Sequence, residues 1–238
     1  MTKKWTYIIV LSLWPLAIFG QSDISKVIDI LNQSQEVYEA QNAYAMDATY
    51  TLYQGAESDV IDEAYDALLI KQEDTYYSRI HHTEHVYFAK AYLKANHDQK
   101  RFQYGAIKEQ QSAEKGITIN NYLNFFKEHK LTETANTYIC TLTSTAITPL
   151  PFGKVVMHID KKTLQIKKQV LYYLGNGVFK DDSGNQFLGT PRLEITFSPI
   201  QTDISTYEEK LLLSSYVQIK KNKAIGIGSL ASYESITF

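Results

Sequence analysis

The sequence predicts an α+β protein: a curved antiparallel half-barrel sheet with helices packed on its concave face. The first observation is the run 44–53, where apolar and polar residues alternate over ten positions, as in a half-buried strand. The second is an amphipathic stretch directly before this run. The third is a series of short strand-like runs separated by polar turns, which is typical of an antiparallel meander.

The first twenty residues have the layout of a secretory signal peptide. Two lysines give a positive start, the run 5–19 is almost wholly apolar, and Gly20 is the small residue expected before a cleavage site. The apolar run is short for a transmembrane anchor, although an uncleaved anchor remains the alternative. We therefore expect segment 1–20 to be a signal peptide cleaved near Gly20. Residues 21–238 then form one periplasmic half-barrel domain with no transmembrane segment.

Residues 22–41 are expected to form the first helix. Ile24, Val27, Ile28 and Leu31 follow the i, i+3, i+4, i+7 spacing of one helical face, and Tyr38 continues this stripe. Such a helix needs an apolar surface to cover, and the strand that follows it offers one.

The remaining elements are expected in a regular order. Strands are expected at 44–53, 65–71, 75–81, 84–89, 92–94, 100–104, 138–143, 154–159, 164–173, 192–197, 211–220 and 224–238. A short helix is expected at 117–128 and a loop at 132–136, and the turn Asp160–Thr163 joins two strands of a hairpin.

Composition excludes several classes of protein. A formal net charge of −2 with mixed signs gives no reason to expect a nucleic-acid partner. The single cysteine, Cys140, excludes an intramolecular disulfide, and its strand-like flanks favour a buried apolar role over that of a nucleophile. No P-loop, nucleophile elbow or dinucleotide fingerprint occurs. We therefore expect no catalytic residues, no metal and no cofactor.

Two sets of polar residues are candidates for a metal site. His81, His82 and His85 are clustered, and a metal-dependent enzyme built on His81 and His85 is the least favoured hypothesis, because imidazole ligands must converge. The run 181–185 has the composition of a calcium loop but not its spacing, and is better interpreted as the tip of a hairpin.

The inner face of the sheet is the remaining candidate site. An apolar lining there is filled either by the protein's own helices at 22–41 and 117–128 or by a ligand. The candidate residues on this face are Met46, Tyr50, Leu52, Leu68, Ile70, Tyr77 and Arg79. Ile166 and Val170 are expected to lie on the same face.

The order of these elements resembles the periplasmic lipoprotein-carrier superfamily, the LolA/LolB-like proteins. The resemblance rests on the helix 24–38, the long strand 44–53, the runs 68–71 and 74–79, and the hairpin 152–173 with its Asp160 turn. The signal-peptide junction and the Tyr-rich strands are similar to those of exported proteins from Bacteroidota-type bacteria. The resemblance implies a half-barrel fold with an apolar cavity for acyl chains.

Two functions follow as expectations. The first is a non-catalytic periplasmic binder or carrier of a lipid or acyl-type ligand, with lipoprotein sorting as one form, in which tyrosine hydroxyls and Arg79 hold the polar head. The second is a cell-envelope interaction module whose barrel is self-filled and whose partners are envelope proteins.

Overall fold

The computed structural model describes residues 20–107, 123–145, 148–181, 183–221 and 223–236. Residues 1–19 of the expected signal peptide and residues 117–122 of the expected second helix lie outside the described residues. The N-terminal helix is α1 (Gly20–Glu39), and the strands of the first half are β1 (Ala43–Tyr53), β2 (Ile61–Gln72), β3 (Thr75–Ile80), β4 (Thr83–Tyr87), β5 (Ala91–Asn96) and β6 (Arg101–Ala106).

The second half continues with further strands and short 3-10 helices. They are β7 (Glu128–Glu133), β8 (Thr137–Thr143), β9 (Phe152–Asp160), β10 (Ile166–Tyr173), β11 (Gly177–Lys180), β12 (Gln186–Gly189), β13 (Arg192–Phe197), η2 (Ser205–Leu211), η3 (Leu213–Ser215), β14 (Val217–Lys220), β15 (Lys223–Gly226), η4 (Gly228–Leu230) and β16 (Glu234–Ile236).

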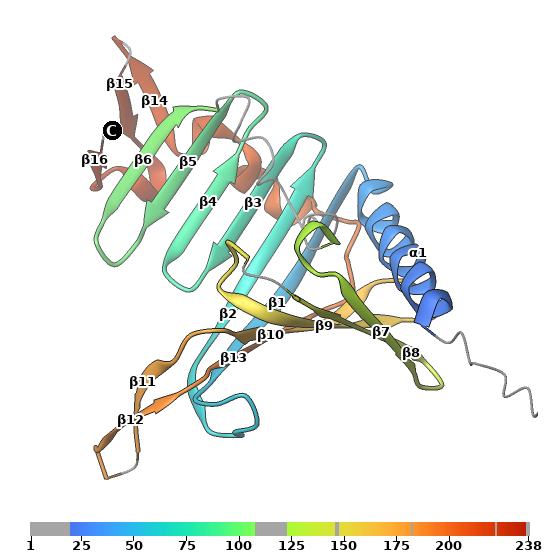
Figure 1. The fold of residues 1–238 in the computed structure, drawn as a ribbon. Coiled ribbons are helices and arrows are strands. Elements are labelled where there is room, and N and C mark those ends of the chain that lie inside the picture. The colour runs from blue at the N-terminus through green and yellow to red at the C-terminus, as the bar shows by residue number, and fades with distance from the viewer. Residues whose placement is uncertain (1–19, 108–122, 146–147, 182, 222, 237–238) are drawn as a thin grey trace, which may run out of the picture.

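Most strands belong to one twelve-stranded sheet, in the order β16-β6-β5-β4-β3-β2-β1-β13-β10-β9-β8-β7. Two antiparallel meanders, β1–β6 and β7–β10 with β13, are joined where β1 pairs with β13. β16 adds to β6 in parallel. Within the described residues the sheet is open, with β16 and β7 at its two edges, and it is strongly twisted (Figure 1).

The two faces of the sheet are covered by different parts of the chain. On one, the α1 face, Val27, Leu31 and Tyr38 of α1 share a core with Met46 and Ala48 of β1. On the other, the C-terminal face, Ala45 and Ile70 share a core with residues of η2, η3 and β14. Figure 1 shows the C-terminal segment, in orange and red, behind β3–β6. The sheet is therefore the middle layer between two covers.

The buried stripe of α1 differs in part from the predicted one. Val27, Ile30, Leu31, Ser34 and Tyr38 are buried, at the spacing of one helical face. Ile24, expected on this stripe, lies near the start of the helix and is 37% exposed, whereas Ile30, which the predicted stripe does not include, is 5% exposed. The stripe thus begins one turn later than the sequence suggests.

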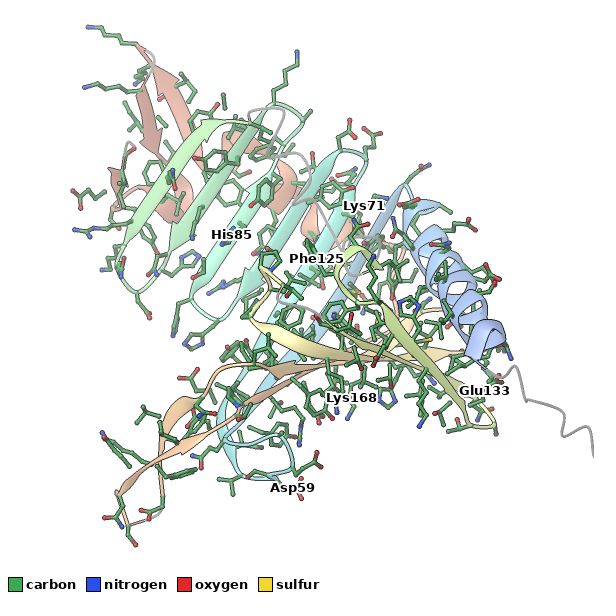
Figure 2. All side chains as sticks on the ribbon, in the orientation of Figure 1. Asp59, Lys71, His85, Phe125, Glu133 and Lys168 are labelled. Carbon is green, nitrogen blue, oxygen red and sulfur yellow. The ribbon has the colours of Figure 1, made fainter. Side chains whose placement is uncertain are left out.

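Polar contacts hold both ends of α1, and Figure 2 labels Lys71 and Glu133, which make them. Lys71 of β2 donates from Nζ to the carbonyl oxygens of Tyr38 (3.1 Å), Glu39 (3.4 Å) and Gln41 (3.0 Å). These carbonyls have no partner within the helix, and a cation there opposes the negative end of the helix dipole. At the other end, Glu133 of β7 pairs with Lys26.

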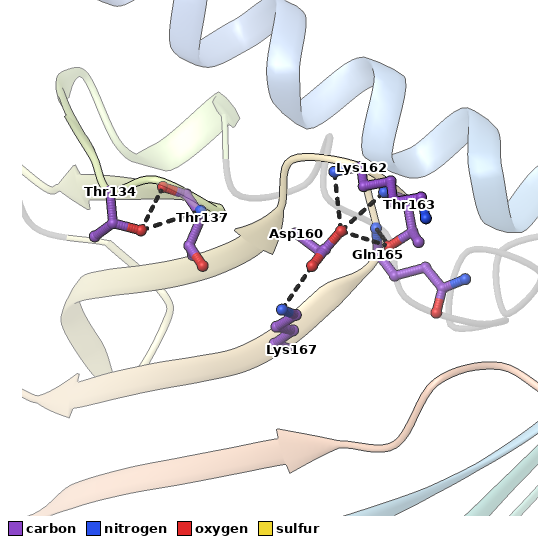
Figure 3. A network of polar contacts seen from close by, with 7 residues as sticks. All are labelled: Thr134, Thr137, Asp160, Lys162, Thr163, Gln165 and Lys167. Carbon is purple, nitrogen blue, oxygen red and sulfur yellow. Dashed lines mark hydrogen bonds and ion pairs between the residues drawn. The ribbon is translucent and has the colours of Figure 1, made fainter.

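The turn at Asp160 forms as predicted (Figure 3). Asp160 Oδ1 accepts hydrogen bonds from the backbone N–H groups of Lys162 and Thr163, each at 2.9 Å, and from the Thr163 hydroxyl at 3.2 Å. Lys167 pairs with the other carboxylate oxygen at 2.6 Å. The hydrogen bonds and the cation hold the pKa of Asp160 well below its usual range. An aspartate at this position therefore fixes the register of β9 with β10.

Several predicted elements are wrong in place or type. The expected loop 132–136 overlaps β7, and the expected helix 117–128 is helical only at 123–125 among its described residues. The expected strand 211–220 contains 3-10 turns and reaches strand conformation only at β14. In the expected helix and the expected strand, the apolar residues suit both periods, and tertiary packing decides between them. The run 132–136 is mostly polar, and its first two residues are drawn into β7 by pairing with β8.

The described residues include no helix that is both long and apolar enough to cross a membrane. The helix α1 spans 20 residues, but its outward face carries charged side chains such as Lys26 and Glu36.

Tyr38→Phe should lower the free energy of unfolding by about 1–3 kcal/mol. The buried Tyr38 hydroxyl accepts a hydrogen bond from the Ile166 N–H at 2.9 Å, and phenylalanine leaves that buried donor unpaired. Urea denaturation measures the change. The matched control is Tyr44→Phe, in the ring that packs 5.8 Å from that of Tyr38. Equal effects of the two changes would refute this role of the hydroxyl.

The attachment of Glu133 should weaken in acid. Side-chain hydrogen bonds from Lys161 and Lys26 lower the pKa of Glu133 to about 2. A carboxyl group with a depressed pKa stabilises the fold above its unfolded pKa and loses this contribution as the pH falls through the folded value. The melting-temperature difference between the wild type and Glu133→Gln should therefore be full at neutral pH and shrink as the pH approaches about 2. A difference that is constant with pH would contradict this assignment.

Candidate ligand-binding face

The predicted site residues do not line one surface. In the register of β1 with β2, Met46 lies opposite Leu69 and Ala45 lies opposite Ile70. Side chains directly opposite each other share a face. Met46, Tyr50 and Leu52 therefore lie on the α1 face, and Leu68 and Ile70 lie on the C-terminal face.

The same register carries into β3. Ile70 lies opposite Tyr77 and Leu68 lies opposite Arg79, so all four belong to the C-terminal face. The expectation of a shared inner lining is thus wrong, because a shift of one residue in register moves every side chain of a strand to the other face. The consecutive apolar residues 68–70 gave no alternation that could fix the register.

On the C-terminal face, Ile70 and Tyr77 are core residues. Each is 2% exposed, and they share a core with Leu211, Tyr216 and other residues of the C-terminal segment. Leu68 packs at the margin of this core, and Arg79 is exposed. Whether any of these residues contacts a ligand stays a prediction, but two of them are already covered by the chain itself.

A buried polar cluster ties the C-terminal segment to the sheet. Glu84 of β4 is 4% exposed and accepts hydrogen bonds from the Tyr216 hydroxyl at 3.0 Å and from His97 Nε2 at 2.9 Å. His97 Nδ1 in turn lies 3.0 Å from the Tyr233 hydroxyl. Burial and the charge of Glu84 raise the pKa of Tyr216 above its usual range. A buried carboxylate needs such partners, so the cluster accounts for the position of the segment.

The α1 face of β3–β6 is different in kind. Its side chains form two rows across the strands: Tyr76, Tyr87 and Tyr92, with Gly105 at the end, and Ser78, His85, Lys94 and Gln103. We call these the tyrosine row and the polar row. Among the described residues, none of the side chains in either row is buried, whereas the opposite face of the same strands carries Val86, Leu93 and Phe102 in a closed core.

The tyrosine row continues toward α1. Lys71 and Tyr44 lie opposite each other in the register that places Tyr76 next to Lys71, and the Lys71 ammonium lies 5.9 Å from the centre of the Tyr44 ring. Burial raises the pKa of Tyr44 and, with nearby Asp74, that of Tyr76, so both are neutral phenols at ordinary pH. The row therefore runs from the edge of the α1 core outward over β3, β4 and β5.

A glycine makes room at the outer end of the row. Gln103 Nε2 donates to the Tyr92 hydroxyl at 2.8 Å. A Cβ atom on Gly105 would lie 2.9 Å from the Tyr92 ring, closer than real Cβ contacts. The ring therefore lies flat across the glycine, with its hydroxyl held by an amide. Neutral rings with fixed hydroxyls can contact an apolar chain with their faces and a polar group with their edges.

A second aromatic group lies on the same face, near the β1–β2 loop. The Tyr50 and Tyr65 rings stack at 6.0 Å, and Tyr65 contacts the His81 ring at 5.4 Å. Leu69 and Ile80 are half-buried and pack against the α1 core. The core beneath α1 is thus bordered, beyond Leu69 and Ile80, by aromatic side chains and not by a polar edge.

The tyrosine row was not predicted. The runs 84–89 and 92–94 were expected as strands, with no pairing between them across the turn at 88–91. A hairpin register about that turn places Tyr87 opposite Tyr92, as the structure does. The signal was present in two tyrosines at equal distances from one turn.

The His81 and His82 rings lie 3.5 Å apart, but the three histidines do not form one group. His81 contacts Tyr65, His82 Nδ1 lies 3.2 Å from Asp98, and His85 lies in the polar row. Within the described residues, no three His, Cys, Asp or Glu side chains are grouped so that they could hold a metal ion.

Two structural interpretations of the sequence are confirmed. Cys140 is fully buried, and burial raises the pKa of its thiol to about 12, so it is an inert core residue. Asp181 accepts hydrogen bonds from the backbone of Ser183 at 2.9 Å and Asn185 at 2.8 Å, which makes 181–185 the tip of the β11–β12 hairpin.

No protein-family model and no curated protein matches the sequence. Solved structures do match the fold at low identity. A DUF1329 family protein from Desulfovibrio piger has 11% identity and a TM-score of 0.39, with 81% of this chain and 98% of that chain covered. A LolA superfamily protein from Nitrosomonas europaea has 9% identity and a TM-score of 0.32, with 74% and 92% covered.

A third similar structure is the Mycobacterium tuberculosis lipoprotein LppX, at 11% identity and a TM-score of 0.36, with 75% of this chain and 99% of that chain covered.

Gly105→Ala should displace the Tyr92 ring and break its hydrogen bond to Gln103, because the new methyl group would overlap the ring. We expect a loss of stability of about 1 kcal/mol. The matched control is Gly175→Ala, since a Cβ atom there meets nothing within 4 Å. Thermal melts compare the two variants, and a Gly105 variant as stable as the control would show that the ring does not lie as described.

Proposed function

We propose that the protein is a non-catalytic binding or carrier protein for a lipid or acyl-type hydrophobic ligand, exported to the periplasm. The ligand would lie on the α1 face of β2–β5, along the tyrosine row. One observation carries this proposal: the apolar core on this face stops at Leu69 and Ile80 and is continued by half-buried tyrosines. On the opposite face, the same strands are closed by a core.

The chemistry of the two rows suits an amphiphile. Ring faces of Tyr76 and Tyr92 offer apolar area, and each methylene group removed from water is worth about 0.8 kcal/mol. The polar row lies two residues farther along each strand on the same face, and supplies Lys94, which is exposed, and Gln103. If the carboxylate or phosphate head of an amphiphile lay over Lys94, its acyl chain would lie on the rings of the tyrosine row.

We place the polar anchor of the ligand in the polar row and not at Arg79. Arg79 projects from the C-terminal face, so it cannot hold the head of a ligand bound on the other side of the sheet. Met46 is 2% exposed beneath α1 and serves the core, whereas Tyr50 and Leu52 are half-buried and remain candidates at the other end of the face.

A cell-envelope interaction module is the second candidate, and one observation favours it. The part of the α1 face over β1, β7–β10 and β13 is filled by the protein's own side chains, including Val27, Leu31 and Phe126, each fully buried. A protein whose sheet is filled throughout needs no ligand and would use its surface to bind envelope proteins.

Native mass spectrometry of the protein purified from its exported fraction distinguishes the two. A carrier should show added mass that organic extraction releases as a fatty-acyl species. Tyr76→Ser combined with Tyr92→Ser should lower the occupancy by about tenfold, because two apolar contacts are lost. A clean apo mass that is unchanged after incubation with lipid would refute the carrier.

The matched control is Arg79→Ala, on the opposite face of β3. It should leave ligand occupancy unchanged. If Arg79→Ala removed the ligand and the tyrosine variant did not, the binding face would be the C-terminal face. Thermal melts of both variants separate loss of binding from loss of fold.

A further inference from the structure

The strands β14 and β15 form a two-stranded ribbon that is separate from the main sheet, and Figure 1 shows it projecting at one end of the molecule. Its antiparallel register places Gln218 opposite Ile225, Ile219 opposite Ala224, and Lys220 opposite Lys223 at the tip. We call the described residues 218–221 and 223–225 the outer ribbon.

The base of the ribbon is fixed to the body of the protein. Val217 is 4% exposed in the core of the C-terminal face, and the Ile227 N–H donates to the Tyr216 carbonyl at 2.8 Å. A Cβ atom on Gly226 would lie 2.1 Å from the carbonyl oxygen of Leu230, so the backbones are in close contact there. The adjoining Tyr216 is held by the buried Glu84. The outer ribbon is thus presented from a rigid base.

The outer ribbon combines cations with exposed apolar side chains. Lys220, Lys221 and Lys223 are exposed, and within the described part of the chain none of them forms an ion pair. Ile219 and Ile225 are each 47% exposed, although isoleucine is among the residues most often buried. The whole chain has a formal net charge of only −2, so this positive charge is local.

Protection of an exposed edge explains part of this pattern. Lysines on edge strands discourage pairing with other chains. That role accounts for the lysines but not for the two isoleucines beside them. The β11–β12 hairpin also exposes apolar side chains, Val178 and Leu188. Its tip differs from that of the outer ribbon, because the acidic Asp181 follows Lys180.

We propose that the outer ribbon docks the protein on a lipid bilayer that carries anionic head groups. Lysine side chains reach phosphate groups while their methylene stems lie along apolar surface. Each lysine near an anionic membrane contributes a favourable electrostatic interaction. Ile219 and Ile225 lie on opposite faces of the ribbon, one and two residue pairs behind the tip, about 3–7 Å along the strands. A ribbon that meets the bilayer end-on brings both within the depth that interfacial segments reach.

The composition of the ribbon favours a membrane over a nucleic acid. Single-stranded nucleic acids bind to basic grooves that also carry aromatic rings for base stacking. The described residues of the ribbon, Val217–Lys220 and Lys223–Gly226, include no aromatic side chain. Aliphatic side chains with lysines suit the boundary between head groups and acyl chains.

This docking surface lies apart from the tyrosine row, and the proposal does not depend on the proposed function. Vesicle binding needs no ligand on the α1 face. A protein that binds vesicles but carries no lipid would therefore support the ribbon and refute the carrier, and the reverse result would do the opposite.

The test is flotation of the protein, purified from its exported fraction, with vesicles of phosphatidylcholine containing about one-third phosphatidylglycerol. We expect binding to these vesicles, weaker binding to pure phosphatidylcholine, and loss of binding between about 0.1 M and about 0.5 M salt. The triple variant Lys220→Gln, Lys221→Gln, Lys223→Gln should lower the partition coefficient by about tenfold or more.

The double variant Ile219→Ser, Ile225→Ser keeps the charge and should also lower partition severalfold. Two controls keep the ribbon intact: Lys90→Gln with Lys162→Gln and Lys180→Gln, and Val178→Ser with Leu188→Ser. Both should bind like the wild type.

The proposal is overturned if the wild type does not float with the vesicles, or if the controls lose as much binding as the ribbon variants. It is also overturned if the isoleucine variant binds fully, because binding would then be adsorption by charge alone. Melting temperatures confirm that each variant is folded.

Discussion

The pairing of β1 with β2 on one side and β13 on the other is the constraint on which the rest of the structure depends. Because side chains alternate along a strand, this double pairing assigns every residue of the central strands to one of two covers. Met46 goes under α1 and its neighbour Ala45 goes under the C-terminal segment, and both are buried. The α1 face and its tyrosines exist as a surface only because the opposite face of β3–β6 is already closed.

Sequence patterns predicted the local structure well where one period dominated. The helix at α1, the long strand β1, the Asp160 turn and most of the meander were predicted, and each has strong local chemistry of its own. The register between strands was not predictable in the same way. The run 68–70 is apolar at every position, so the sequence does not show which of its side chains lie on which face of the sheet. The pairing of β2 with β1 determines this. This is why four of the seven predicted site residues lie on the opposite face from the other three.

Ala45, Ile70 and Tyr77 are buried beneath the C-terminal segment, a second cover of the sheet that was not predicted. The alternation in 44–53 predicts a half-buried strand with one face in solvent, as in many antiparallel sheets. The C-terminal segment closes that face instead, through an apolar core and through the hydrogen bonds of Glu84. A mostly irregular segment with short 3-10 turns has no periodicity that marks it as a cover. Its buried contacts come from residues far apart in sequence, such as Tyr216 and Glu84.

The junction of β1 with β13 also has a consequence for the order in which the chain can fold. The meander β1–β6 is built from neighbouring hairpins and can form early, because its contacts are local. Ala48 cannot meet Phe197 until nearly the whole chain is available. Until then, α1 and the α1 face of β1 lack most of their apolar partners, which come from β8, β9 and β10. A nascent chain emerging from its N-terminus would therefore expose this helix until β13 has been made, and the pairing of β13 with β1 would act as the step that commits the chain to the native state.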